Sequence, residues 1–195
     1  MLILVAGLVL FLGVHSARIV AEPARRRFIA ERGENAWKGI YSLVSLVGLV
    51  LIVVGYRAAP DVILWVPPVW LRHVALVLTA IAFVLVAAAY VPGNRIRAAV
   101  GHPMVLGVKV WAFAHLLANG TLASVVLFGA FLAWAVADFV AARRRDRADG
   151  VERGAASGSL GATFATVAVG LVAWVAFAGW LHRILIGVSP IAVGA

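Results

Sequence analysis

Cysteine is absent from this chain of 195 residues, so disulfides, thiolate metal sites and redox-active thiols are excluded. Charge is also scarce: Asp, Glu, Lys and Arg make up 13% of the residues, whereas a soluble domain has about 25%. Hydrophobic residues instead make up 64%, and the mean hydropathy is +1.04. A water-soluble fold of this length cannot bury so much apolar surface. The composition predicts a membrane protein without a separate soluble catalytic domain.

The net charge of +9 reflects a shortage of acidic residues, 8 against 17 basic ones. The basic residues occur in short segments between apolar runs, where lysine and arginine set membrane orientation and meet anionic lipid headgroups. The charge therefore favours the lipid bilayer as its partner, and no nucleic acid is expected.

Six apolar segments have about the length that a helix needs to cross the hydrocarbon core. They are residues 1–17, 37–56, 72–91, 103–119, 121–141 and 163–187. The first has no basic residue before Arg18 and no convincing small-x-small cleavage site, so we interpret it as a retained helix rather than a signal peptide. The sequence predicts an all-α polytopic membrane protein, a six-helix transmembrane bundle forming one domain over 1–195.

The connecting segments carry most of the basic residues on one side. Thirteen fall between spans 1 and 2, 3 and 4, or 5 and 6, namely Arg18, Arg25, Arg26, Arg27, Arg32, Lys38, Arg95, Arg97, Arg143, Arg144, Arg145, Arg147 and Arg153. The opposite side has Arg57, Arg72 and Arg183. The positive-inside rule places the thirteen in the cytoplasm. We expect a protein that crosses the membrane several times, with both termini on the outer side.

Three connections have a character of their own. "AEPARRRFIAERG" (21–33) predicts a short helix at the cytoplasmic interface, with Pro23 at its first position. "WVPPVW" (65–70) predicts an outer turn with two tryptophans at headgroup level. The basic, then Gly- and Ser-rich segment 143–162 predicts a mobile loop.

The stretch "HPMVLGVKVWAFAHLLANG" (102–120) places three ionisable residues, His102, Lys109 and His115, in or beside one apolar span. Ionisable groups at membrane depth usually face the bundle interior and mark function. His102 and Lys109 share a helix face, but His115 lies about 220° around and about 20 Å along from His102. The two histidines of this span therefore cannot hold one metal ion together. Trp111, one turn before His115, predicts a flat wall beside it.

His15, in the first span, is the natural second ligand for a site that includes His115. Histidine pairs on separate membrane helices suit a haem, whose iron takes axial imidazoles. A zinc site is less favoured without cysteine. A proton relay through His15, His102 and Asp138 is the alternative. His73 and His182 each adjoin an arginine and are interpreted as interfacial anchors.

Three stretches, "GENAWKGIYSLVSLVGLVLIVVGY" (33–56), "GHPMVLGVKVWAFAHLLANG" (101–120) and "ASVVLFGAFLAWAV" (123–136), resemble the NnrU family of bacterial membrane proteins, named from denitrification gene regions. That family is similar to the 15-cis-zeta-carotene isomerase, a haem b membrane enzyme. The resemblance implies His15 and His115 as axial ligands. Where the isomerase has a cysteine proposed as an alternative ligand, this chain has Ala112, and Lys109 has no obvious counterpart there.

The expected cofactor is therefore haem b, with His15 and His115 on the iron. Lys109 would pair with a haem propionate or a buried carboxylate, and His102 would support the site from the helix start. Because His15 is predicted near the inner face and His115 nearer the outer, their pairing needs a tilted or shifted first span. Otherwise His15 would pair with His102.

Two classes of function remain. One is an isomerase-like enzyme that isomerises or changes the redox state of an apolar small molecule, such as a polyene or a quinone. The other is a non-catalytic membrane factor that supports denitrification enzymes in assembly, expression or sensing, docking through a basic surface. A haem-free transport role ranks third.

Overall fold

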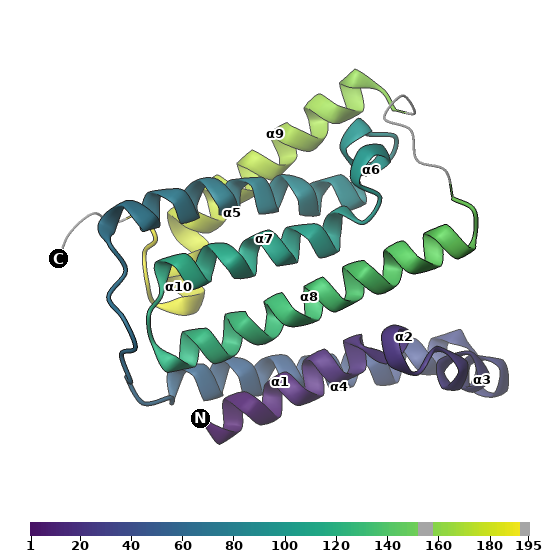
Figure 1. Cartoon of the computed structure of the whole chain (residues 1–195), viewed down its shortest axis with the longest axis horizontal. Coiled ribbons are helices and arrows are strands. Elements are labelled where there is room, and N and C mark those ends of the chain that lie inside the picture. Colours follow the sequence, from purple (N-terminus) through teal and green to yellow (C-terminus); the bar gives the residue numbers. More distant parts are fainter. Residues whose placement is uncertain (152–157, 192–195) are drawn as a thin grey trace. The chain divides into compact units, whose positions relative to one another are not determined.

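The computed structural model describes residues 1–151 and 158–191, and its regular structure there is helical, with two isolated β-bridges (Figure 1). The helices are α1 (Leu2–His15), α2 (Ala17–Val20), α3 (Glu22–Arg32), α4 (Glu34–Arg57), α5 (Val69–Tyr90), α6 (Arg95–Val100), α7 (Pro103–Ala118), α8 (Leu122–Ala148), α9 (Leu160–Ala176) and α10 (His182–Ile186), with a π-helical turn η1 (Phe177–Leu181) between the last two. The prediction of an all-α fold is confirmed.

Four helical segments are long and apolar enough to cross a membrane: α4, α5, α8, and the run Leu160–Ile186 that comprises α9, η1 and α10. They coincide with four of the predicted spans. The other two predicted spans correspond to α1 and α7, which are apolar but have only 14 and 16 residues. A membrane-type helical protein is confirmed, and the count of six spans stays a prediction.

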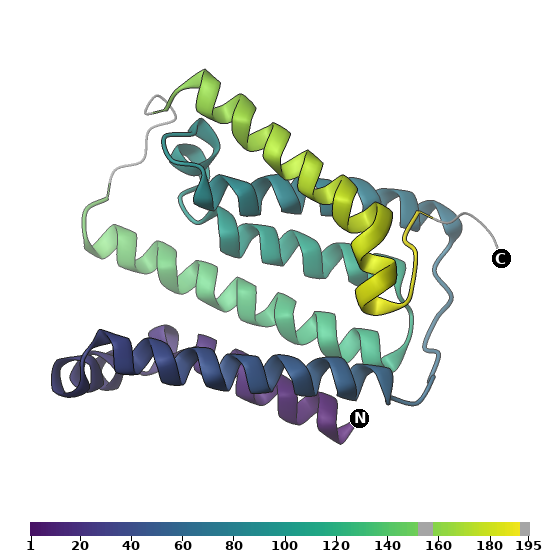
Figure 2. The same ribbon diagram turned by 180° about the vertical axis from the view of Figure 1, so that it is seen from behind.

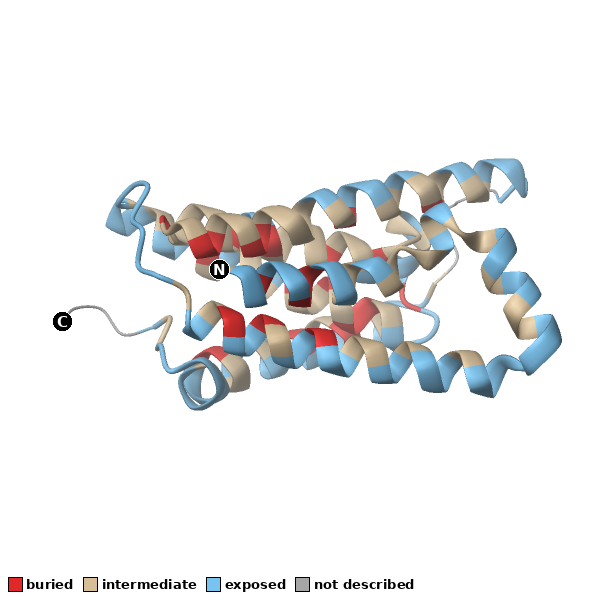
Figure 3. Cartoon of the chain, turned by 90° about the horizontal axis from the view of Figure 1, so that it is seen from below, coloured by how far each residue is buried: buried red, intermediate tan, exposed pale blue. Residues whose placement is uncertain are grey.

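Large apolar side chains cover much of the helix surface. In each of the four long helical segments, at most 22% of the most apolar stretch of 18 residues is buried. Leu43, Val77 and Val172 are each more than 60% exposed. Figure 3 shows buried residues as short bands within helices that are otherwise exposed or intermediate. Such surfaces suit lipid contact, because lipid chains are as apolar as the side chains that meet them.

The chain divides into two compact units. The first comprises Met1–Val66 with Asn119–Ala141, and the second comprises Pro67–Ala118 with the chain from Ala142 onward. Helix α8 contributes its first twenty residues to the first unit and its last two turns to the second. The single transmembrane domain expected over 1–195 stays a prediction.

In the first unit, α1 runs antiparallel to α4 at close range (Figure 1). Glycine makes the approach possible: a Cβ on Gly7 would lie 2.6 Å from the Ile52 backbone nitrogen, and one on Gly48 would lie 2.8 Å from that of Phe11. Small residues at helix contacts are typical of membrane proteins. This register places His15, the last residue of α1, at the level of residue 44 of α4.

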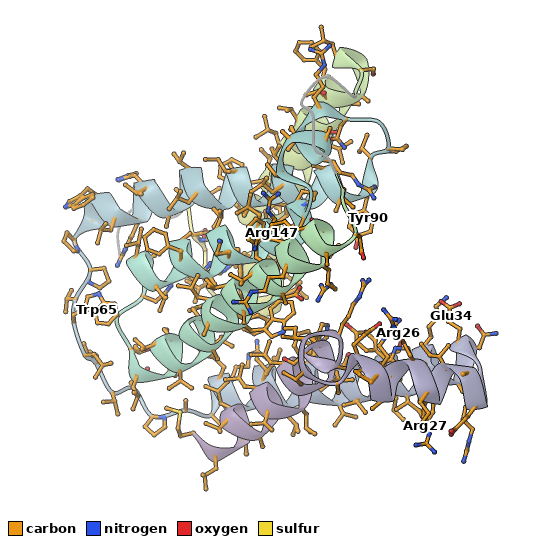
Figure 4. The ribbon with its side chains drawn as sticks, turned by 45° about the vertical axis from the view of Figure 1, so that its right-hand side comes forward. Arg26, Arg27, Glu34, Trp65, Tyr90 and Arg147 are labelled. Atoms are coloured by element: carbon orange, nitrogen blue, oxygen red, sulfur yellow. The ribbon has the colours of Figure 1, made fainter. Side chains whose placement is uncertain are left out.

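Helix α3 confirms the predicted short helix in 21–33, but it begins at Glu22, so Pro23 is its second residue and not its first. Ion pairs within the helix join Glu22 to Arg25 and Arg26, and Glu31 to Arg27. Figure 4 shows Arg26, Arg27 and Glu34 at one end of the first unit and Trp65 at its other end.

In the second unit, α5 packs antiparallel to α7 and to α9 (Figure 2). Gly107 lets α7 approach α5, where an added Cβ would lie 3.0 Å from the Ala82 carbonyl oxygen. On the other side, the Trp174 indole of α9 donates to Thr79 Oγ1 of α5 at 3.1 Å.

The predicted mobile loop 143–162 is wrong at both ends, because α8 continues to Ala148 and α9 already begins at Leu160. Alanine and arginine are strong helix formers, and no glycine interrupts the chain before Gly150. Residues 152–157 of that prediction lie outside the described residues.

Candidate functional site

His15 is held at the end of α1 by its own helix. Its Nδ1 lies 2.6 Å from the Phe11 carbonyl oxygen, one turn earlier. Because a carbonyl can only accept, Nδ1 carries the proton and donates it, which leaves the lone pair of the neutral imidazole on Nε2. The Phe11 ring stacks on the imidazole at a centroid distance of 4.2 Å.

Two further aromatic rings of the first unit surround His15. Tyr41 of α4 lies 5.0 Å away between ring centroids, and Trp134 of α8 meets the imidazole at 5.9 Å in an edge-to-face arrangement. Phe131 in turn packs on Phe11 at 5.7 Å. His15 is thus the half-buried centre of an aromatic cluster formed by Phe11, Tyr41, Phe131 and Trp134, which we call the His15 cluster.

His115 repeats the local geometry of His15 in the second unit. Its Nδ1 donates to the Trp111 carbonyl oxygen at 2.8 Å, so the lone pair again belongs to Nε2. The Trp111 ring packs against the imidazole at 4.9 Å, as the spacing predicts. His15 and His115 therefore have the same local arrangement, in which the residue four positions earlier supplies both an aromatic ring and a carbonyl acceptor.

His102 is bound to a residue that the sequence analysis did not single out. Its Nε2 donates to Asp146 Oδ2 of α8 at 2.8 Å, and both side chains are half-buried. Asp146 interrupts the arginine run at the end of α8, which is the only signal that the sequence offers for it. The contact fixes the beginning of α7 to the last turns of α8 within the second unit.

The other candidates are placed as follows. Lys109 is half-buried on α7, two residues after the close approach at Gly107. His182 begins α10, where its Nδ1 donates to the Val188 carbonyl oxygen at 2.6 Å. It also meets Phe177 edge-on at 5.8 Å. His73 is exposed near the start of α5, as expected of an interfacial anchor.

The structure brings together Trp111 with His115, and His102 with Asp146, in the second unit. It places His15 in the first. Within the described part of the chain, no three His, Asp or Glu side chains gather in a group that could hold a metal ion. Tyr41 and Trp134 were missed at the sequence level, because each comes close to His15 only through the packing of separate helices.

No curated protein and no solved structure matches this chain. The model of one protein family does match, and the description of that family is "NnrU protein". The match extends over residues 3–190 and so includes the helices that carry His15, His102, Lys109 and His115. The chain belongs to the NnrU family.

Proposed function

We propose that this protein crosses the bacterial inner membrane six times, with both termini in the periplasm, and binds haem b with His15 and His115 as axial ligands. One observation carries the proposal. Both imidazoles donate Nδ1–H to the carbonyl one turn earlier and so direct the lone pair to Nε2. Haem ligands are commonly neutral imidazoles whose other nitrogen donates to a backbone carbonyl or a carboxylate, which fixes the tautomer.

The surroundings of both histidines also fit a haem. Flat aromatic rings lie against each imidazole, namely Phe11 and Tyr41 beside His15, and Trp111 beside His115. A porphyrin needs apolar, flat neighbours and two axial ligands, and it needs no cluster of three ligating side chains. When bound, haem would supply a redox-active iron for isomerisation or redox change of an apolar substrate.

Other side chains of the second unit would support the site. Trp111 would hold the ring plane of His115, since it supplies both the carbonyl acceptor and the packed indole. Lys109, half-buried on α7, would pair with a haem propionate or a buried carboxylate. His102, which is bonded to Asp146, would fix the start of α7 and so the depth of His115 in the membrane.

The proposed orientation follows the distribution of charge. The arginine-rich helix α3 and the loop with Trp65 lie at opposite ends of the first unit, as a cytoplasmic and a periplasmic end would (Figure 4). The absence of cysteine allows a direct test: single cysteines at the exposed positions Ala30 and Val66 should be labelled from the cytoplasmic and the periplasmic side, respectively.

A second function is favoured by the basic end of α8, where Arg144 and Arg147 are exposed. A membrane factor that supports denitrification enzymes without catalysis of its own would dock through such a surface. Substitution of Arg144 and Arg147 by uncharged residues would abolish the support of denitrification enzymes but leave haem binding intact.

The decisive experiment is a pyridine-haemochrome spectrum of the purified protein, expressed with ample haem, beside His15→Ala and His115→Ala. The exposed His73→Ala is the matched control. We expect a Soret band in the wild type and in the control that is lost in both test variants. A wild type without haem would refute the cofactor and leave the denitrification factor as the leading function.

A further inference from the structure

Two buried polar side-chain atoms in the described residues have no hydrogen-bond partner, Trp134 Nε1 and Ser45 Oγ. Both belong to the first unit. An unpaired buried donor is costly in a protein interior, and more so at membrane depth, where no bulk water can replace the partner. Phenylalanine and alanine would fill the same space without that cost, so the two polar groups call for a partner.

Trp134 is related to His15 by a ring contact, and Ser45 is related to it by the register of α1 against α4. The Trp134 ring meets the imidazole at 5.9 Å between centroids. Ser45 lies one turn after Tyr41, which contacts His15, and the antiparallel register of α1 and α4 brings Ser45 to the same level. The His15 cluster therefore has apolar walls and one unpaired donor, Trp134 Nε1, beside an imidazole whose lone pair is on Nε2. The unpaired Ser45 hydroxyl lies at the same level on α4.

The chemistry of the two groups defines what they can bind. An indole N–H is a donor only, and a serine hydroxyl donates as well as accepts. Neither is charged, so together they suit an acceptor oxygen of a carbonyl or carboxylate. The location favours a carboxylate, because His15 ends α1 next to the arginine-bearing segment 18–32, where the charged edge of a membrane ligand would lie.

We infer that the Trp134 indole N–H and the Ser45 hydroxyl form an acceptor-binding subsite beside His15 that takes the propionate of the haem bound there. The inference rests on the proposed function and adds to it two residues that neither the sequence nor the family pattern singled out. Trp134 and Ser45 are positioning residues, because they hold the ligand and do not bind the iron.

The test compares Trp134→Phe and Ser45→Ala with matched controls. Trp134→Phe keeps a ring and removes the N–H, and Ser45→Ala removes only the hydroxyl. The controls are Trp180→Phe, whose ring is 64% exposed, and Ser42→Ala, an exposed serine on the same helix. Haem loss from the purified protein is followed by transfer to excess apomyoglobin. Each test variant should lose haem roughly three- to tenfold faster than the wild type, as expected for one lost hydrogen bond, while the controls match the wild type.

Reconstitution with haem dimethyl ester identifies the acceptor. If the partner is a propionate carboxylate, the substitutions should change the rate of ester loss less than they change the rate of haem loss, because esterification removes the carboxylate charge. Variants that match the wild type with haem overturn the inference and leave the proposed function standing. An undiminished difference with the ester overturns the propionate as partner. A wild type that takes up no haem refutes the proposed function and the inference with it.

Discussion

The two units of this membrane protein hold their helices together in different ways. In the first, α1 and α4 pack backbone against backbone through Gly7, Gly48 and Gly55. In the second, side-chain hydrogen bonds join segments far apart in sequence. Trp174 donates to Thr79, and the segment that begins α6 is bonded to Gly158 and Thr163. The first unit has such a bond as well, because a hydrogen bond of 2.9 Å joins Tyr56 Oη of α4 to Ser124 Oγ of α8. The contact between α1 and α4 in that unit nevertheless depends on shape, whereas the contact between α5 and α9 in the second unit includes a polar pair.

Against that difference, the histidine of each unit is oriented in the same way. His15 and His115 each donate to the carbonyl one turn earlier and pack on the ring of that same residue. Helix geometry alone places position i−4 beside position i. The orientation of each imidazole is therefore local, whereas its wider surroundings come from tertiary packing.

The largest effect should follow a substitution in the glycine contact of the first unit. In Gly7→Ala, the new Cβ would meet three backbone atoms of α4 at 2.6 to 2.9 Å, so the two helices must separate. We expect a loss of about 3 kcal/mol in the free energy of unfolding, measured by SDS titration of the protein in mixed micelles.

The control for this prediction is Gly13→Ala on the same helix, where a Cβ would meet nothing within 4 Å. This variant should be as stable as the wild type or slightly more so, because alanine is the better helix former. Equal losses in both variants would mean that the approach of α1 to α4 does not account for the effect.

The sequence predicted the parts of the fold that hydropathy governs. The predicted spans 37–56 and 72–91 lie within three residues of α4 and α5 at every end. The end of α8 was missed, because hydropathy falls at Arg143 while helix propensity does not. Helix α6 was missed because six residues with two arginines resemble any short basic loop.

The candidate site was predictable only in its local part. The spacing of Trp111 and His115 indicates their contact, since both lie on one helix. The pairing of His102 with Asp146 joins residues 44 positions apart, and the approach of Trp134 to His15 joins α8 to α1. No periodicity in the sequence reports such contacts, because they depend on which helices pack together and in which register.

In the second unit, the largest effect should come from Asn94, whose side chain is 2% exposed. Its Oδ1 accepts from the Arg97 backbone N–H at the beginning of α6, and its Nδ2 donates to the carbonyls of Ala88 and Val91. Asn94→Ala should cost about 2 kcal/mol, the upper range for a helix cap, because it also leaves buried carbonyls unpaired. Ser159→Ala, which removes the exposed cap of α9, is the comparison and should cost less in the same titration.

A smaller effect is expected where a polar bond joins two spans of the second unit. Trp174→Phe removes the indole donor to Thr79 and keeps an aromatic ring in place. Hydrogen bonds between membrane helices average about 0.6 kcal/mol, so the loss should be of that size. The double variant with Thr79→Val tests whether this hydrogen bond stabilises the protein. If the losses of stability in the two single variants simply add, the side chains are not coupled, and the proposed contribution of the bond between α5 and α9 is refuted.

The smallest effect should be electrostatic and confined to α3 of the first unit. The hydrogen bond from Arg26 lowers the pKa of Glu22 below its usual value of 4.5, and partial burial opposes that shift while the charges of Arg25, Arg26 and Arg18 add to it. A lowered pKa in the folded state adds stability that is present above pH 4.5 and is lost as the pH falls through the lowered value. Because the pair lies at the surface, we expect only about 0.3–0.5 kcal/mol.

Glu22→Gln should remove this part of the acid dependence of the unfolding midpoint. Glu31, which is paired with Arg27 on the same helix, provides the control, and Glu31→Gln should leave this acid dependence in place. If Glu22→Gln has the same acid dependence as the wild type, the Glu22–Arg26 pair adds nothing to the stability of the first unit.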